Sequence, residues 1–244
     1  VLAICQAGVM ASTVFASFLC VGGVLLLLAF LKLDAGSKNR IFPQGVLNPR
    51  TVPGSGLVMM SSLFMATIAL TVYGPLLMHI IFGAEPLVAG YIIALESLGW
   101  TVVAITPSGV SVRVEARLIR LGSVLVSISM VGLIYAMPSG PIWLIALLSS
   151  IMGIGFGMSW SFVSKRIIAN VSEAERAQAS ASIPTFMRVS MALGSALSGI
   201  IANFSGFSED SSVEVAQNVA FWCFAAFVPL IVVGLFTAWR VSRE

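Results

Sequence analysis

Long runs of apolar residues without a charge divide this sequence into segments of membrane-spanning length. A bilayer core of about 30 Å is crossed by roughly 20 apolar residues in a helix. The runs are continuously apolar rather than alternating with a period of two, which favours helices over the strands of a β-barrel. Seven helices are therefore expected, over residues 1–31, 51–84, 86–106, 183–203 and 215–239 and, on either side of a turn at 137–141, within residues 112–164.

The composition supports this interpretation, because 58% of the 244 residues are hydrophobic and only 9% are charged. Soluble domains carry about 25% charged residues. Three cysteines and a net charge of +3 do not fit a disulfide scaffold or a nucleic-acid-binding domain. We therefore expect an all-α integral membrane protein whose surroundings are a lipid bilayer and which binds no nucleic acid.

The charged residues predict how the chain is oriented in the membrane. All Lys and Arg residues except Arg188 fall in loops or tails on one side of the predicted spans. The opposite loops carry acidic residues instead, such as Glu85 and Glu214. Because Lys and Arg are enriched in cytoplasmic loops, we expect the first residues outside the cell and the C-terminus in the cytoplasm. The membrane would be the plasma membrane, which is the inner membrane in bacteria.

The polar stretch 32–53, which carries three prolines, is typical of a cytoplasmic linker. It would separate a single helix at 1–31 from a six-helix transmembrane bundle at 54–240, which is followed by a cytoplasmic tail at 241–244. The apolar run begins at the first residue and lacks the basic region of a signal peptide. We interpret the sequence as a fragment of a larger membrane protein, with a processed seven-helix protein as the alternative.

This layout of one helix, a long linker and six helices resembles the major facilitator superfamily, from the last helix of its N-terminal half onward. The family carries a Gly-x-x-x-Asp-Arg-x-Gly-Arg-Arg pattern in a cytoplasmic loop. Here Gly109 and Arg117 match that pattern, and Arg113 stands where Asp is expected. The helix with Arg188, followed by Gly and Ser residues, is similar to helix eleven of the drug/proton antiporter branches.

The resemblance implies a secondary transporter that works by alternating access. Its substrate site would lie at the interface with a missing N-terminal half of the same transporter. It further implies proton-driven efflux of small amphipathic compounds, while uptake of sugars or organic acids stays open as an alternative.

Two charged residues lie inside the predicted spans and are the first candidates for a transport role. Glu96 is about ten residues from either end of its helix, hence near the bilayer midplane. Ionisable groups at that depth usually face a cavity or a partner and mark ion or proton routes. We expect Glu96 to couple transport to protons, or to bind a cationic substrate, and to pair with Arg188. The alternatives are a structural, hydrogen-bonded Glu96 and an Arg188 that extends to the membrane surface.

Further residues of the predicted helices are candidates for a substrate cavity or a gate. Gly74 and Pro75 predict a kink, which serves either gating or packing. Gly153, Gly155 and Gly157 permit close approach of neighbouring helices. The candidates for the cavity lining are Thr71, Tyr73, Trp100, Ser149, Phe156 and Trp160.

The sequence contains no pattern typical of an enzyme. No His, Cys, Asp or Glu cluster has metal-ligand spacing, and no phosphate-binding glycine loop precedes a lysine. We therefore expect no catalytic residue, cofactor or metal, and a small-molecule substrate with protons as the partners. A seven-helix membrane receptor is the main alternative, because it has the same topology, and a channel is the third possibility.

Overall fold

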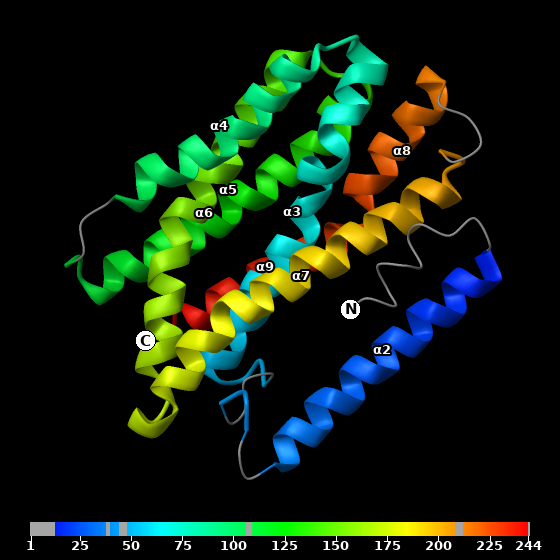
Figure 1. Cartoon of the computed structure of the whole chain (residues 1–244). Helices are drawn as coiled ribbons and strands as arrows, with labels where there is room; N and C mark the ends of the chain where they lie inside the picture. The colour runs from blue at the N-terminus through cyan, green and yellow to red at the C-terminus, as the bar shows by residue number, and fades with distance from the viewer. Residues whose placement is uncertain (1–12, 38–39, 44–47, 106–108, 208–211, 244) are drawn as a thin grey trace.

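The computed structural model describes residues 13–37, 40–43, 48–105, 109–207 and 212–243. Within these residues all regular structure is helical (Figure 1). The elements are α2 (Thr13–Gly36), α3 (Val52–Phe82), α4 (Pro86–Ala104), α5 (Val112–Ser139), α6 (Ile142–Ala169), the 3₁₀ helix η1 (Glu173–Glu175), α7 (Arg176–Phe204), α8 (Val213–Ala225) and α9 (Val228–Val241).

Six segments are long and apolar enough to cross a membrane: α3, α4, α5, α6, η1 with α7, and α8 with α9. This confirms the all-α class in the described part of the chain, and each of the six predicted segments after residue 50 contains a helical stretch of membrane-spanning length. The first predicted span, 1–31, begins with residues that lie outside the described part of the chain. Its remainder is in α2, which continues past the predicted end to Gly36.

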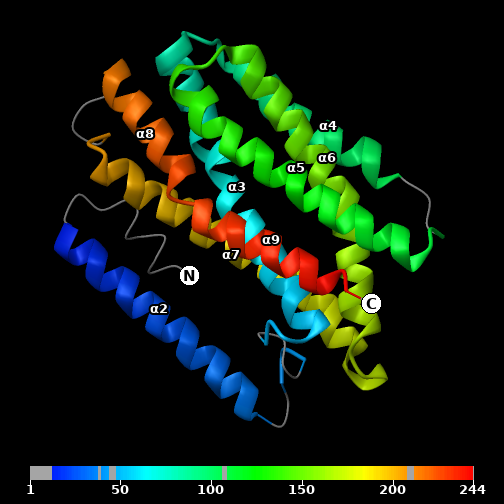
Figure 2. The ribbon, with the colours of Figure 1, turned by 180° about the vertical axis from the view of Figure 1, so that it is seen from behind.

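The six segments pack around α3, which contacts α4, α6, α7, α8 and α9. Helix α6 lies between α4 and α5 on one side of α3, and α7 lies on the other side (Figures 1 and 2). The buried core includes large side chains along the whole of α3, such as Leu57, Leu70 and Leu77. In both views α2 lies outside the bundle, alongside α7.

Local sequence signals set the two ends of α3. The Thr51 side chain accepts a hydrogen bond from Gly54 N at 3.2 Å, and Pro53 lies in the first turn, where its missing N–H costs no helical bond. At the other end Gly83 adopts φ +64° and donates to His79 O at 3.0 Å, which closes the helix. The turn into α4 is therefore fixed by Gly83.

The segment predicted as one helix over 215–239 is two helices, and that prediction was wrong in this respect. α8 ends at Ala225 and α9 begins at Val228. Pro229 explains the break, because it has no N–H to donate to Ala225 O and its ring clashes with that carbonyl. The Phe227 carbonyl accepts from Leu230 N and Ile231 N as α9 starts.

The helix predicted over 183–203 begins earlier, at Arg176. The prediction started the helix at the first apolar residues, whereas the helix already begins at Arg176 and includes the Ala, Gln and Ser residues that follow it. Glu173 and Glu175 precede its first turn in η1, where acidic side chains favour a helix N-terminus. Arg188 consequently lies about three turns into α7.

Three glycines of α6 bring this helix against both of its neighbours. A Cβ atom added to Gly153 would lie 1.9 Å from Glu96 O of α4, and one added to Gly157 would lie 2.6 Å from Trp100 O. On the other side, a Cβ at Gly155 would lie 2.6 Å from Gly122 O of α5. Only glycine allows these backbones to approach so closely, which agrees with the packing role expected from the sequence.

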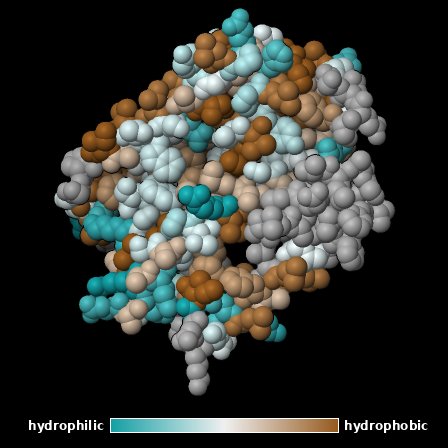
Figure 3. Space-filling model, viewed as in Figure 1, coloured by the Kyte–Doolittle hydropathy of each residue, from teal (hydrophilic) through white to brown (hydrophobic). Residues whose placement is uncertain are grey.

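The two ends of the bundle differ in charge. Hydrophilic residues gather where α6 ends and α7 begins, and hydrophobic residues gather over α4 (Figure 3). We call the end where α3 and α7 begin the basic end, because the described Lys and Arg residues, apart from Arg188, lie on the segments that meet there. The opposite end includes the turn between α3 and α4, which carries Glu85.

Candidate functional site

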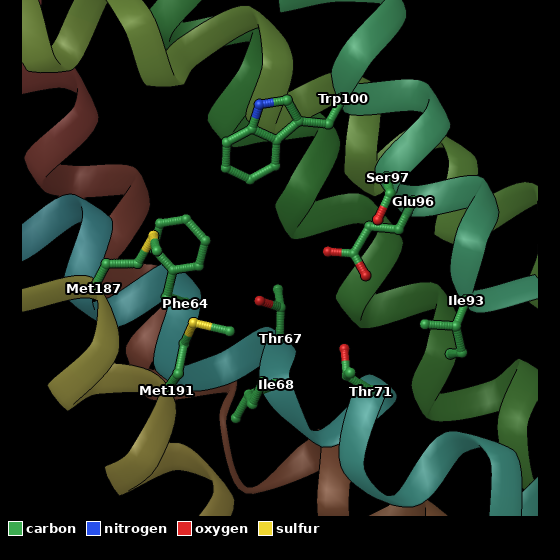
Figure 4. A pocket seen from close by; sticks show the side chains of 10 residues that line it. All are labelled: Phe64, Thr67, Ile68, Thr71, Ile93, Glu96, Ser97, Trp100, Met187 and Met191. Atoms are coloured by element: carbon green, nitrogen blue, oxygen red, sulfur yellow. The ribbon is translucent and has the colours of Figure 1, made fainter. Parts of the chain in front are cut away.

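A cavity of about 300 Å³ opens between α3, α4 and α7. Its lining combines aromatic rings, methionines and hydroxyl groups with a single carboxyl group (Figure 4). The residues that line it are Phe64, Thr67, Ile68, Thr71, Ile93, Glu96, Ser97, Trp100, Met187 and Met191.

Each of the three helices presents one face to this cavity. The α3 positions are 64, 67, 68 and 71, which are spaced three and four residues apart and therefore share one side of the helix. On α4 the same spacing brings Ile93, Glu96 and Trp100 onto one face, and on α7 Met187 and Met191 are one turn apart. The site is thus built by helical periodicity on three separate elements.

Glu96 lies in the middle of α4, ten residues after Pro86, which is about 15 Å along the helix axis. Its side chain is half-buried, and its carboxylate points from α4 into the cavity toward Thr67 of α3 (Figure 4). In the described part of the chain this carboxylate has neither an ion-pair nor a hydrogen-bond partner. An unpaired carboxylate in an apolar medium is costly, so a proton or a cation from outside the protein has a place to bind here.

Four aromatic rings form a cluster at the side of the cavity nearer the basic end. The Phe64 and Phe156 rings stack with centroids 4.8 Å apart, and Trp100 stacks on Phe156 at 5.5 Å. Trp160 contacts the edge of Phe64 at 5.4 Å and lies 5.6 Å from Trp100. Because these rings come from α3, α4 and α6, the cluster joins the three helices where the cavity ends.

Two of the six residues predicted for the cavity lining, Thr71 and Trp100, do line it. Phe156 and Trp160 lie behind them in the aromatic cluster rather than on the cavity surface. Ser149 is buried in the packing of α6, where it donates to Ile145 O at 2.8 Å. Tyr73 is half-buried beside Phe207 at 6.4 Å, away from the lining.

The predicted ion pair between Glu96 and Arg188 is not formed. Arg188 is exposed on α7, directly after Met187, and is not part of the cavity lining. Successive residues of a helix point about 100° apart, so the turn that directs Met187 and Met191 into the cavity directs Arg188 elsewhere. The predicted pair relied on the reach of a long Arg side chain, and the sequence did not specify on which face of α7 Arg188 lies.

The predicted kink residues lie on α3 just beyond the cavity. The helix is continuous through Pro75. Gly74 is buried, and a Cβ there would lie 3.2 Å from Leu70 Cδ1 and 3.4 Å from Ile93 Cδ1 of α4. Because Pro75 has no N–H, the carbonyl of the lining residue Thr71 loses its usual helical bond.

The residues of the loop pattern lie at the basic end. Gly109 has φ +135°, a conformation that favours glycine, and precedes α5. Arg113 and Arg117 are exposed on the first turns of α5 rather than in a loop. A buried charge of this region, Glu115, was not among the residues predicted from the sequence: it is 3% exposed and accepts a hydrogen bond from Lys165 Nζ.

Two arginines fasten the end of α9 to the neighbouring helices at the basic end. Arg166 is 8% exposed, donates to Val241 O at 2.9 Å and to Val112 O at 3.1 Å, and its Nε lies 4.0 Å from Glu115 Oε2. Arg120 donates to Ser242 Oγ at 2.6 Å and lies over the Trp239 ring at 4.7 Å. These contacts join the ends of α5, α6 and α9.

Most residues of the cavity lining were not predicted from the sequence. Their signal was the spacing of Thr67 and Thr71 on α3 and of Met187 and Met191 on α7, which matches one helix face in each case. Which faces meet depends on the packing of the helices. In the described part of the chain no three His, Cys, Asp or Glu side chains come close enough to hold a metal ion.

Comparisons with known proteins give one type of relative. No family model matches the chain. Over 228 residues it is 24% identical to a protein of Mycobacterium tuberculosis named a "probable multidrug-efflux transporter", and a protein of the same name from a second strain matches equally well. The match covers 90% of this chain, and the chain spans about half (46%) of the length of each relative.

Proposed function

We propose that this chain forms part of a secondary active membrane transporter that moves small, amphipathic organic compounds out of the cell in exchange for protons. The six membrane-length helices and the similarity to a protein named an efflux transporter support this proposal. The same similarity does not favour the alternative of a seven-helix receptor.

The observation that carries the proposal is the unpaired carboxylate of Glu96, which faces the cavity in the middle of α4. A proton or a cationic group of a substrate would neutralise this carboxylate. Competition between the two for one carboxylate would exchange protons for substrate. Glu96 is therefore the residue that we propose to couple protons to substrate. Arg188 is exposed on α7, and any role that we propose for it is at the surface of this helix.

The rest of the lining suits an amphipathic compound. The rings of Phe64 and Trp100 offer apolar faces that also attract cations. Met187 and Met191 are flexible and polarisable, so they can adapt to compounds of different shape. Hydroxyl groups of Thr67 and Thr71 lie on the α3 side of the cavity.

A transporter of the major facilitator type would combine these parts as follows. Residues 1–31 would form the last helix of an N-terminal half, 32–53 a cytoplasmic linker, 54–240 the C-terminal bundle and 241–244 a cytoplasmic tail. The basic end would face the cytoplasm, since Lys and Arg mark that side. The N-terminal half would cover the cavity of Figure 4 from the open side, and the halves would rock about the site.

Transport by the whole gene product in inside-out membrane vesicles tests the proposal. We expect rhodamine 6G, an amphipathic dye, to accumulate inside the vesicles when a proton gradient, acidic inside, is imposed. Collapse of the gradient with a protonophore should release the dye. Equal dye levels in vesicles with and without the protein, at the same total membrane protein, would contradict the proposal.

A further inference from the structure

The chain between α2 and α3 makes specific contacts that a simple linker does not need. Asp34, in the last turn of α2, is buried, and its carboxylate accepts hydrogen bonds from Ile41 N at 2.7 Å and Phe42 N at 3.1 Å. A carboxylate that accepts two backbone N–H groups holds them firmly. The chain is thereby folded back against the end of α2.

This fold places the side chain of Phe42 between two helices. Phe42 is 8% exposed, and its ring lies 6.1 Å from that of Phe30 on α2 and 4.9 Å from that of Phe186 on α7. The single ring of Phe42 thus packs against both helices. We call residues 40–42 the strap.

A second contact fixes the strap to α7. Gln178 Nε2 donates to the Arg40 carbonyl at 2.9 Å. Gln178 and Phe186 are eight residues apart, slightly more than two turns, so both lie on the same side of α7. The two positions of α7 that contact the strap are therefore about 12 Å apart along the helix axis, and one contact is a hydrogen bond whereas the other is between aromatic rings.

The side of α7 that the strap covers adjoins the candidate site. Phe186 directly precedes Met187, and Met187 and Met191 form the α7 wall of the cavity. A shift of Phe186 would rotate or translate both methionines, because helices move as rigid units over one or two turns. The strap therefore lies where it can hold the α7 wall of the cavity in position.

From these contacts we infer that Asp34 and Phe42 are positioning residues: the strap joins α2 and α7 into one moving unit and holds the α7 wall of the substrate cavity in place. This inference rests on the proposed transport function for its effect on activity, but not for its geometry. Neither residue contacts the cavity, so both act through Phe186.

The geometry is tested by crosslinking in the whole gene product after Cys5, Cys20 and Cys223 are replaced by Ala. The pair Phe42→Cys and Phe186→Cys should be joined by a short bismaleimide, with the linked peptides identified by mass spectrometry. The pair Leu33→Cys and Phe186→Cys is the control, because Leu33 of α2 is 75% exposed and should not link. Equal linking of both pairs, or of neither, would overturn the inference.

The positioning role is tested by transport of rhodamine 6G. Asp34→Ala and Phe42→Ala should raise the KM about five-fold, which is about 1 kcal/mol of affinity, at unchanged maximal rate and membrane level. Phe42→Leu should restore most of the affinity, and Lys32→Ala, an exposed change in the same turn of α2, should have no effect. The crosslinked pair should still transport, because the strap and α7 move together.

An unchanged KM in Asp34→Ala and Phe42→Ala, or loss of transport on crosslinking, would overturn the positioning role. Absence of transport by the parent protein would instead count against the proposed function, and the crosslinking result would then still decide whether the strap is fixed to α7.

Discussion

The position of Glu96 depends on a residue that has no side chain. The Glu96 carbonyl occupies the space that a Cβ atom of Gly153 would need, with the two only 1.9 Å apart. Gly157 has the same relation to Trp100 one turn further along. The spacing between α4 and α6 at the candidate site is therefore set by these two glycines of α6.

Gly153→Ala should force α4 away from α6 at Glu96. Overpacking of this kind costs about 1–3 kcal/mol, so we expect a lower Tm in detergent and weaker transport. Gly90→Ala is the matched control, because Gly90 is an exposed residue of α4 and a Cβ atom added there would have no other atom within 4 Å. An unchanged Tm for Gly153→Ala would mean that the two helices are not packed as closely as described.

Glu115→Ala should destabilise the basic end of the bundle. The change leaves the buried guanidinium of Arg166 without its nearest carboxylate, and loss of one member of a buried pair costs about 3 kcal/mol or more. Thermal unfolding should occur at a lower temperature than in the parent. Glu173→Ala, which removes an exposed carboxylate at the same end, should lower this temperature far less.

Among single residues, the sequence indicated Glu96 as a candidate but did not indicate most of the residues that line the cavity around it. A lone carboxylate in an apolar run is recognisable because burial of a charge is costly. Thr71 and Trp100, two of the candidates for a substrate cavity, lie on the lining of the cavity between α3, α4 and α7. The sequence did not show that Arg188 and Ser149 lie away from the cavity, because the side of a helix that meets a neighbour is fixed only when the helices pack.

At the scale of elements, Pro229 divides the last membrane segment into α8 and α9. Pro229→Ala should restore a donor for Ala225 O and make the segment one continuous helix. We expect the backbone amides from Phe227 to Ile231 to exchange more slowly with deuterium, as measured by mass spectrometry. Unchanged exchange would show that packing against α3 and α5, rather than proline, produces the break.

The six membrane segments after residue 50 were predictable because each is a long apolar run. The turn between α5 and α6 was predictable from Gly140 and Pro141, although Pro138, which was also assigned to the turn, lies inside the last turn of α5. The start of α7 was not, since its first residues are Arg176 followed by Ala, Gln and Ser residues, which lie before the apolar run. The break at Pro229 was missed because hydropathy does not change across it.

At the scale of the molecule, the site and the strap both depend on distant parts of the chain. The cavity combines residues 64–71, 93–100 and 187–191, and the strap joins α2 to α7 through residue 42. Apolar runs predict neither, since a run contains no information about which helices are neighbours. Charge, in contrast, predicts the orientation in the membrane without knowledge of the fold.

The proposed coupling of protons to substrate by Glu96 is tested by Glu96→Gln, because glutamine keeps the shape of the side chain but carries no ionisable group. In vesicles with the whole gene product, this variant should lose uptake of rhodamine 6G driven by a proton gradient. It should retain exchange of internal for external dye, which needs no net proton movement. Glu85→Gln, at the start of the same helix, should behave as the parent. Proton-driven uptake by Glu96→Gln at the parental rate would contradict a coupling role of Glu96.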